Sequence, residues 1–358
     1  MKPMADTRPC CRADLPRAFW SRLSVALVLA CVSGACSRSP TTPTPAPPAD
    51  PGPPTISCPS AVTVQSADGG SVPVTYSAPT ATGGFQPLTG PTCAPASDSL
   101  FAPGATRVSC TVTDAKQRAD TCTFAVTVTL PPRISVTRVL AFGDSMTWGE
   151  DGTTLTLQPF QDAAASHPAV RFPTSQTYPG VLEADLRARY TTQSPTVTNA
   201  GLVGEAVTAP TTFSRFTSYT SSRQYDVVLI LEGANDLADR DATIELVVIA
   251  GLRRMVQDAK SRGIIPVLAT LPPQKGNGCC PNRGLAWSLV PGFNDRVKTL
   301  AASEAVLLVD VYQAFANDPT TLIGADGLHP TSAGYRVMGD AFYNVIRQVF
   351  ETRPSARR

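Results

Sequence analysis

Three side chains of this sequence could together perform acyl transfer. Ser145 ends the string Gly143-Asp144-Ser145, and Asp326 and His329 lie in Asp326-Gly327-Leu328-His329-Pro330. A serine hydroxyl becomes a useful nucleophile when an imidazole accepts its proton, and a carboxylate can hold that imidazole in the required tautomer. The chain has only two histidines, and the other, His167, lies in a polar stretch that predicts a solvated side chain. Ser145, Asp326 and His329 are therefore a candidate catalytic triad.

The elements that must position these residues alternate between strands and helices from about residue 134 to 352. Apolar runs predict strands at 139–142, 196–199, 227–231, 264–269 and 306–310. Amphipathic spacing predicts helices over 179–190, over a segment capped by Asp241 and ending at Gly263, and over 331–349. This alternation predicts an α/β fold with a doubly wound parallel sheet.

Further polar or glycine positions follow the predicted strands, where open α/β sheets bind ligands. Gly204 ends Gly201-Leu202-Val203-Gly204, and Asn235 lies in Gly233-Ala234-Asn235-Asp236. Each residue alone has a purely structural alternative: Ser145 could cap a helix, Asn235 could belong to a turn, and His329 could begin a surface helix. We expect Asp144 and Asp236 to be structural.

Taken in order, these four blocks resemble those of the SGNH (GDSL-type) hydrolases over residues 134–350. The resemblance implies a flavodoxin-like three-layer fold and a serine esterase in which Ser145 is the nucleophile, His329 the base and Asp326 the orienting acid. It also implies an oxyanion hole formed by the backbone N–H groups of Ser145 and Gly204 and the side-chain amide of Asn235. A glycine is expected at Gly204 because the missing Cβ allows close approach of the backbone.

The resemblance leaves the acyl group and the alcohol open, since the family includes lipases, thioesterases, lysophospholipases and carbohydrate acetylesterases. We favour an ester on a glycan; a lipid ester is the alternative, and a non-catalytic surface adhesin is the alternative from another class. No cluster of metal ligands is visible, so we expect no metal and no cofactor. The long connection from Glu150 to Thr177 is expected to form a loop or hairpin over the site. The adjacent Cys279 and Cys280 are expected to be structural or neutral.

Residues 55–131 show short runs of period two separated by glycine-containing turns, which predicts a small β-sandwich. Its four cysteines (Cys58, Cys93, Cys110 and Cys122) are expected to form two disulfides. Of the three possible pairings, we guess Cys58–Cys122 and Cys93–Cys110. The segment resembles the HYR (hyalin repeat) domain, an immunoglobulin-like module, and the resemblance rests on these strings: 56–59, 101–106, 108–114 and 122–128. It implies either a spacer or a module that binds carbohydrate or protein.

The N-terminal 36 residues indicate an export signal, in which arginines precede a short apolar run over 23–30. Val32-Ser33-Gly34-Ala35-Cys36 resembles a lipobox with Cys36 as the lipidated residue; the alternatives are Cys31 and ordinary secretion. The Pro- and Thr-rich residues 37–54 predict an extended linker. We therefore expect a cell-surface lipoprotein that contacts the membrane only through its lipid anchor. The alternative is a secreted or periplasmic protein. The formal net charge of +2 excludes a strong electrostatic footprint for nucleic acid. The oligomeric state is left open.

Overall fold

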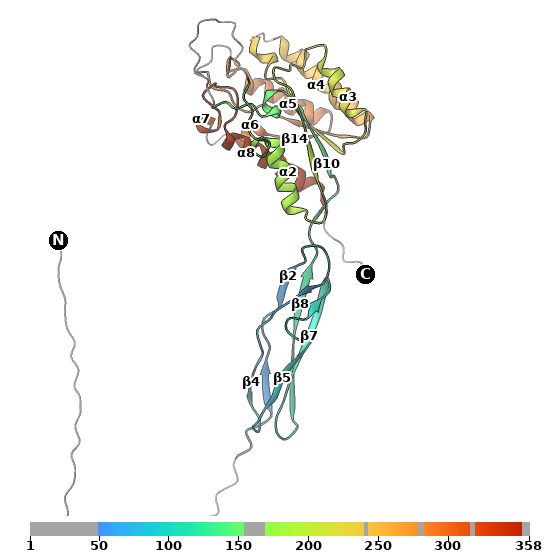
Figure 1. Cartoon of the computed structure of the whole chain (residues 1–358), viewed down its shortest axis with the longest axis vertical. Coiled ribbons are helices and arrows are strands. Elements are labelled where there is room, and N and C mark those ends of the chain that lie inside the picture. The colour runs from blue at the N-terminus through green and yellow to red at the C-terminus, as the bar shows by residue number, and fades with distance from the viewer. Residues whose placement is uncertain are drawn as a thin grey trace, which may run out of the picture. The chain divides into compact units, whose positions relative to one another are not determined.

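The computed structural model describes residues 49–153, 169–239, 243–276, 278, 283–315 and 319–352. These residues form a β-domain and an α/β domain (Figure 1). Several predictions lie outside the described residues: the export signal with Cys31 and Cys36, most of the linker, His167, Asp241, and the pair Cys279 and Cys280. Among the helices of the described residues, none has both the length and the apolar composition needed to cross a membrane.

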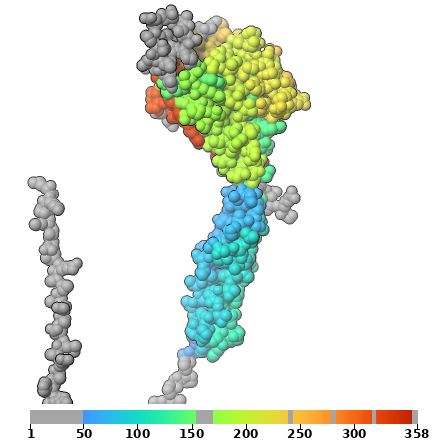
Figure 2. Space-filling model, in the orientation of Figure 1, coloured from blue at the N-terminus to red at the C-terminus, as the bar shows by residue number. Residues whose placement is uncertain are grey.

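The β-domain packs short strands around one apolar core. Its strands are β1 (Pro54–Ser57), β2 (Val62–Gln65), β3 (Val72–Pro73), β4 (Thr80–Gly83), β5 (Thr89–Ala94), β6 (Leu100–Phe101), β7 (Gly104–Thr113) and β8 (Ala119–Thr129). They pair as a four-stranded sheet in the order β2-β8-β7-β5 and as the pairs β1-β4 and β3-β6. The strands run along the length of a narrow body, coloured blue to teal in Figure 2. The alternating buried residues of β7 and β8, such as Val108, Val112 and Val126, supply the core, as their period of two predicts.

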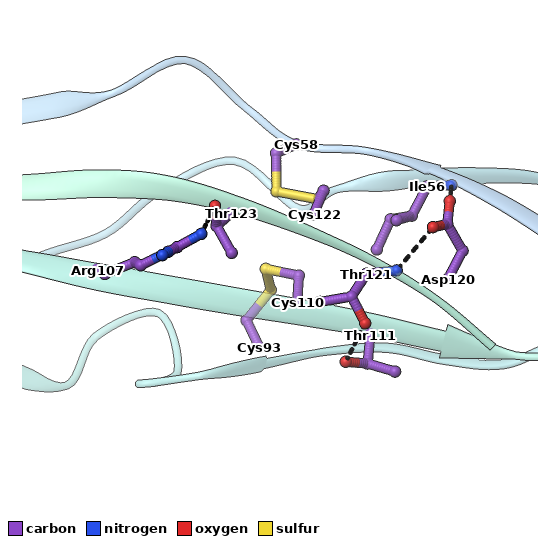
Figure 3. Close-up of a disulfide and its surroundings, with 10 residues drawn as sticks. All are labelled: Ile56, Cys58, Cys93, Arg107, Cys110, Thr111, Asp120, Thr121, Cys122 and Thr123. Carbon is purple, nitrogen blue, oxygen red and sulfur yellow. Dashed lines mark hydrogen bonds between the residues drawn. A yellow bond between two sulfur atoms is a disulfide. The ribbon is translucent and has the colours of Figure 1, made fainter.

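Two disulfides join the strands of this domain (Figure 3). Cys58, directly after β1, is bonded to Cys122 on β8, and Cys93 on β5 is bonded to Cys110 on β7. These are the same two pairs that we guessed from the sequence. Cys93 and Cys110 are direct neighbours in the register of β5 and β7. The first bond therefore links separate sheets, whereas the second reinforces a strand pair that is already hydrogen-bonded.

The α/β domain is built on a five-stranded parallel sheet, which confirms the predicted doubly wound fold. Its strands are β10 (Arg138–Gly143), β11 (Thr196–Gly201), β12 (Val227–Leu231), β13 (Ile265–Ala269) and β14 (Leu307–Val309), in the order β11-β10-β12-β13-β14. Every residue of β12 is buried, as the unbroken apolar run predicts for a central strand covered on both faces. Because the order reverses beside β10, the loops that follow β10, β11 and β12 meet at one edge of the sheet.

Helices cover both faces of this sheet (Figure 1). The long helices are α2 (Tyr178–Arg189), α3 (Thr212–Thr220), α4 (Ile244–Ser261), α5 (Val290–Ser303) and α8 (Ser332–Phe350). Helix α2 packs against α8, while α4 packs against α3 and α5. The short pair β9 (Arg133–Ile134) and β15 (Glu351–Thr352) joins the two ends of the domain. One predicted detail is wrong: Thr243, rather than Asp241, occupies the N-cap position of α4, and its side chain makes no capping hydrogen bond.

Candidate active site

The structure brings Ser145, His329 and Asp326 into one hydrogen-bonded chain. The Ser145 Oγ atom lies 2.8 Å from His329 Nε2, and His329 Nδ1 lies 2.6 Å from Asp326 Oδ2. All three residues are buried, with at most 4% of their surface exposed. With Nδ1 donating to the carboxylate, Nε2 is the acceptor for the serine proton. The three residues thus have the geometry of a nucleophile, a general base and an orienting carboxylate.

Ser145 begins the short helix α1 (Ser145–Trp148) directly after β10. The Asp144 side chain caps this helix by accepting a hydrogen bond of 2.8 Å from the backbone N–H of Met146. The Asn199 amide, on the neighbouring strand β11, donates to the backbone carbonyl of Thr147 at 2.7 Å. Ser145, the candidate nucleophile, is therefore held by the cap of its own helix and by the adjacent strand. Asp144 acts here as the structural residue that we expected.

The loop before α8 fixes Asp326 and His329. Asp326 Oδ1 accepts hydrogen bonds from the backbone N–H groups of Leu328 and His329 at 3.0 and 2.9 Å. Gly152 packs so closely against this loop that a Cβ atom there would lie 2.2 Å from the His329 carbonyl oxygen. Burial alone would raise the pKa of the Asp326 carboxyl, but its hydrogen bonds and the adjacent His329 outweigh burial and lower that pKa. Asp326 is thereby kept in the charged form that orients the imidazole.

The two predicted oxyanion residues follow the strands on either side of β10. Gly204 has φ of +73°, and in the described part of the chain no atom lies within 4 Å of the position that a Cβ would take. The left-handed backbone is one reason for a glycine at this position, and the open space leaves the Gly204 N–H free of contact with neighbouring described side chains; close approach of this backbone to a bound oxyanion stays a prediction. The Asn235 amide donates to the Glu205 carbonyl oxygen at 2.8 Å, and an amide carries a second N–H. Asp236 is structural, because its carboxylate accepts from the backbone N–H of Val207 at 2.8 Å.

Two charged residues near the triad were not anticipated from the sequence. Glu150 follows α1, and Arg283 lies on the segment before α5. The Arg283 guanidinium donates to Asp326 Oδ2 at 2.8 Å and to Glu150 Oε1 at 2.6 Å. Neither residue belongs to a block of recognisable spacing, so the sequence offers only one signal, a glutamate close behind the nucleophile. Their contact with the triad depends on two loops that are 133 residues apart.

The two ends of the connection that follows Ser145 pair with each other in antiparallel orientation. Glu150 and Arg171 form an antiparallel bridge, and the Phe172 N–H donates to the Gly149 carbonyl at 3.0 Å. The residues between, 154–168, lie outside the described part, and so does His167. Within the described residues no group of three or more His, Cys, Asp or Glu side chains could hold a metal ion.

Asp144 and Glu232 are buried carboxyls, and the charge of Asp144 acts on Glu232. Glu232, directly after β12, is 2% exposed; among the described residues no donor reaches its carboxylate oxygens, and its neighbour is the Glu205 side chain, to which a protonated Glu232 can donate. Burial raises the pKa of Asp144 to about 7. Burial, with the charges of Asp144 and Glu205, raises the pKa of Glu232 well above its usual range. These carboxyls therefore hold protons in the folded chain at pH values where the unfolded chain has lost them.

We expect Glu232→Gln to stabilise the protein relative to wild type, and more so at pH 8 than at pH 5. A carboxyl whose pKa is raised by folding contributes stability at low pH, and that contribution is lost as the pH rises toward its folded pKa. The gain in unfolding free energy between pH 5 and pH 8 should be at least about 1.4 kcal/mol, the equivalent of one pKa unit. Urea unfolding at both pH values measures it. Glu304→Gln, which removes a carboxylate from the ion pair with Arg253, controls for net charge; an equal gain at both pH values would contradict the prediction.

The geometry of the site matches a serine hydrolase on a doubly wound α/β fold, and comparison with known families agrees. The GDSL-like Lipase/Acylhydrolase family matches residues 141–337, and the HYR domain matches residues 49–128. The chain therefore belongs to the GDSL-like lipase/acylhydrolase family, and it is a carboxylic ester hydrolase of this type. Residues 49–128 are a HYR domain.

The chain is also similar to solved structures of esterases. A carbohydrate acetylesterase from Sinorhizobium meliloti is 20% identical, with 59% of this chain and 99% of that chain covered and a TM-score of 0.48. An aryl esterase from M. smegmatis is 22% identical, with coverages of 60% and 99% and a TM-score of 0.47. An acetylxylan esterase from Geobacillus stearothermophilus is 24% identical, with coverages of 58% and 93% and a TM-score of 0.44. A comparison with the curated proteins finds no match.

Proposed function

We propose that the chain is an exported serine esterase that hydrolyses carboxylic esters through an acyl-enzyme on Ser145. The observation that carries the proposal is the 2.8 Å contact between Ser145 Oγ and His329 Nε2, with Asp326 bonded to the other ring nitrogen. A non-catalytic adhesin would have no need for this buried arrangement. The two-disulfide HYR domain suggests an extracellular protein.

The reaction would proceed in two steps. Ser145 Oγ attacks the ester carbonyl carbon while its proton passes to His329 Nε2, and the tetrahedral intermediate expels the alcohol, which takes that proton. A water molecule then attacks the acyl-enzyme, gives its proton to His329, and releases the acid as the serine recovers its hydrogen. Asp326 stabilises the imidazolium in both steps. The backbone N–H groups of Ser145 and Gly204 and the Asn235 amide would donate to the oxyanion.

The substrate that we favour is an ester on an extracellular glycan. The proposal is supported by the N-terminal sequence: a signal with a lipobox at Cys36 would hold the enzyme at the cell surface, and residues 37–54 would separate it from the membrane. In this arrangement residues 55–131 form the sandwich and residues 134–352 the hydrolase domain. The sandwich would act as a spacer or would bind a partner on the cell surface.

A lipid ester is the second candidate, and one observation favours it. Leu202 and Val203, the two residues before Gly204, are 47% and 42% exposed. If the Gly204 N–H binds the carbonyl oxygen, the side chains of its chain neighbours Leu202 and Val203 would be candidates to contact the acyl group. Burying additional methylene groups against them would favour longer acyl chains, by about 0.8 kcal/mol for each fully buried CH₂.

An acyl-chain series separates the two candidates. The purified protein would be assayed on 4-nitrophenyl esters from acetyl to palmitoyl, with an acetylated polysaccharide alongside. For the glycan esterase we expect the highest kcat/KM on acetyl and release of acetate from the polysaccharide. A lipid esterase would instead prefer long chains, and Leu202→Ser should then lower kcat/KM on palmitoyl more than on acetyl. No hydrolysis of any member of the series would contradict the proposed function.

A further inference from the structure

A ring of charged groups surrounds the imidazole of His329. Arg283 Nη1 lies 2.8 Å from Asp326 Oδ2 and 3.2 Å from His329 Nδ1, and Arg283 Nη2 lies 2.6 Å from Glu150 Oε1. The second Glu150 oxygen lies 3.5 Å from His329 Nε2, the nitrogen that faces Ser145 Oγ. The contacts therefore close a ring from Glu150 through Arg283 and Asp326 to His329 and back to Glu150.

This ring is largely shielded from water. The side chains of Glu150, Asp326 and His329 are at most 3% exposed, and that of Arg283 is 26% exposed. Two carboxylates at such burial would each carry a large desolvation cost without a cationic partner. Arg283 supplies that partner to both of them at once. Its guanidinium presents several N–H donors in one plane, which suits two carboxylates on different loops.

The charge of the ring changes when the serine loses its proton. With a neutral imidazole, the two carboxylates and one guanidinium sum to −1; with an imidazolium, the ring is neutral. Glu150 therefore adds to the stabilisation of the imidazolium that forms during acylation, on the Nε2 side opposite Asp326. Arg283 opposes the imidazolium electrostatically, so the two residues bias His329 in opposite directions.

We propose that Glu150 and Arg283 are positioning residues that set the proton affinity of His329 and hold Asp326 in place. This inference rests on the proposed function, since it requires His329 to be the base. Glu150 is itself held rigidly: the Tyr335 hydroxyl donates to its backbone carbonyl at 2.8 Å, and its backbone bridges Arg171. Among the described residues, the other titratable groups close to this ring include Asp144, the cap of α1, which interacts with the charge of His329, and the Tyr335 hydroxyl, which interacts with Glu150 and Asp326.

The test compares the pH profiles of kcat/KM for Glu150→Gln and Arg283→Met on 4-nitrophenyl acetate. In Glu150→Gln the guanidinium remains without its second carboxylate, so His329 stays neutral to lower pH, and the acid limb of the profile should move down by about one pH unit. In Arg283→Met both carboxylates remain, so the acid limb should move up by about one unit. We also expect Glu150→Gln to lower kcat about tenfold with KM unchanged, because Glu150 acts on the imidazolium and not on substrate binding.

Two further variants keep the test decisive. Arg283→Lys retains the positive charge, so the acid limb of its pH profile should match that of wild type. This comparison stays informative if Arg283→Met folds poorly. Glu304→Gln makes the same chemical change in an ion pair before β14, at the opposite edge of the sheet, and should leave the profile unmoved. The inference would be overturned if the acid limb of the kcat/KM profile stayed in place in both variants, or moved in the same direction in both. This outcome requires that Ser145→Ala is inactive. Activity retained in Ser145→Ala would instead overturn the proposed function itself.

Discussion

Ser145→Ala is expected to lower kcat by roughly 10⁴- to 10⁶-fold, because the acyl-enzyme cannot form without the hydroxyl. This corresponds to about 5 to 8 kcal/mol of transition-state stabilisation. His329→Ala should fall in the same range, since the serine hydroxyl is a weak nucleophile without the base at 2.8 Å. The double variant should be little worse than either single variant, because the two residues act as a unit. Initial rates on 4-nitrophenyl acetate measure all three.

A matched control accompanies this prediction. Ser261→Ala removes a hydroxyl that donates to the Asp258 carbonyl at the end of α4, on the edge of the sheet away from the nucleophile. It should retain wild-type kcat. Ser145→Ala should keep the wild-type thermal midpoint within a few degrees, which would separate lost chemistry from lost folding. Ser145→Ala activity within tenfold of wild type would refute the triad.

Removing the Cys58–Cys122 disulfide is expected to destabilise the β-domain by about 4 kcal/mol, against about 3 kcal/mol for Cys93–Cys110. The estimates follow from loop-closure entropy, because the first bond spans 64 residues and the second spans 17. The first bond also joins separate sheets, whereas the second joins paired strands β5 and β7. Cys58→Ala/Cys122→Ala should therefore be the more easily cleaved by protease during urea unfolding.

The full chain contains a convenient internal reference for this experiment. All three tryptophans lie outside residues 55–131, and Trp148 and Trp287 belong to the α/β domain. Tryptophan fluorescence therefore follows the α/β domain, while far-UV circular dichroism and proteolysis also follow the β-domain. Esterase kcat should be unchanged in both double variants. A larger loss for Cys93→Ala/Cys110→Ala would contradict the loop-length argument.

Much of the architecture follows from local pattern in the sequence. The apolar run 227–231 coincides with β12, and the final predicted helix, 331–349, lies within one residue of α8 (Ser332–Phe350) at both ends. The strand is fully buried and the helix is long, so the pattern of apolar residues in each predicts which side chains are buried. The N-cap of α4 was predicted wrongly because a capping residue type does not by itself fix where the first turn begins: Thr243 occupies the N-cap position without a side-chain capping hydrogen bond.

The shared location of the candidate nucleophile and the two candidate oxyanion residues was predictable from sequence for a similar reason. Ser145, Gly204 and Asn235 each follow a strand, and parallel strands bring their carboxyl ends to one edge whatever the length of the intervening segments. A position directly after a strand therefore predicts which residues lie close together in the fold, even when they are far apart in the sequence. The reason for Gly204 was less predictable, since its positive φ is a property of the folded loop.

The sequence by itself determined the fold class, the family and the identity of the candidate nucleophile, base and acid, because these depend on periodicity and on motifs at strand ends. The tertiary structure alone decided the environment of those residues. Glu150 and Arg283 meet at His329 only because two irregular loops converge there, and no spacing rule connects positions 133 residues apart. The raised pKa of Glu232 is likewise a consequence of its burial close to Asp144 and Glu205, which a residue type does not reveal.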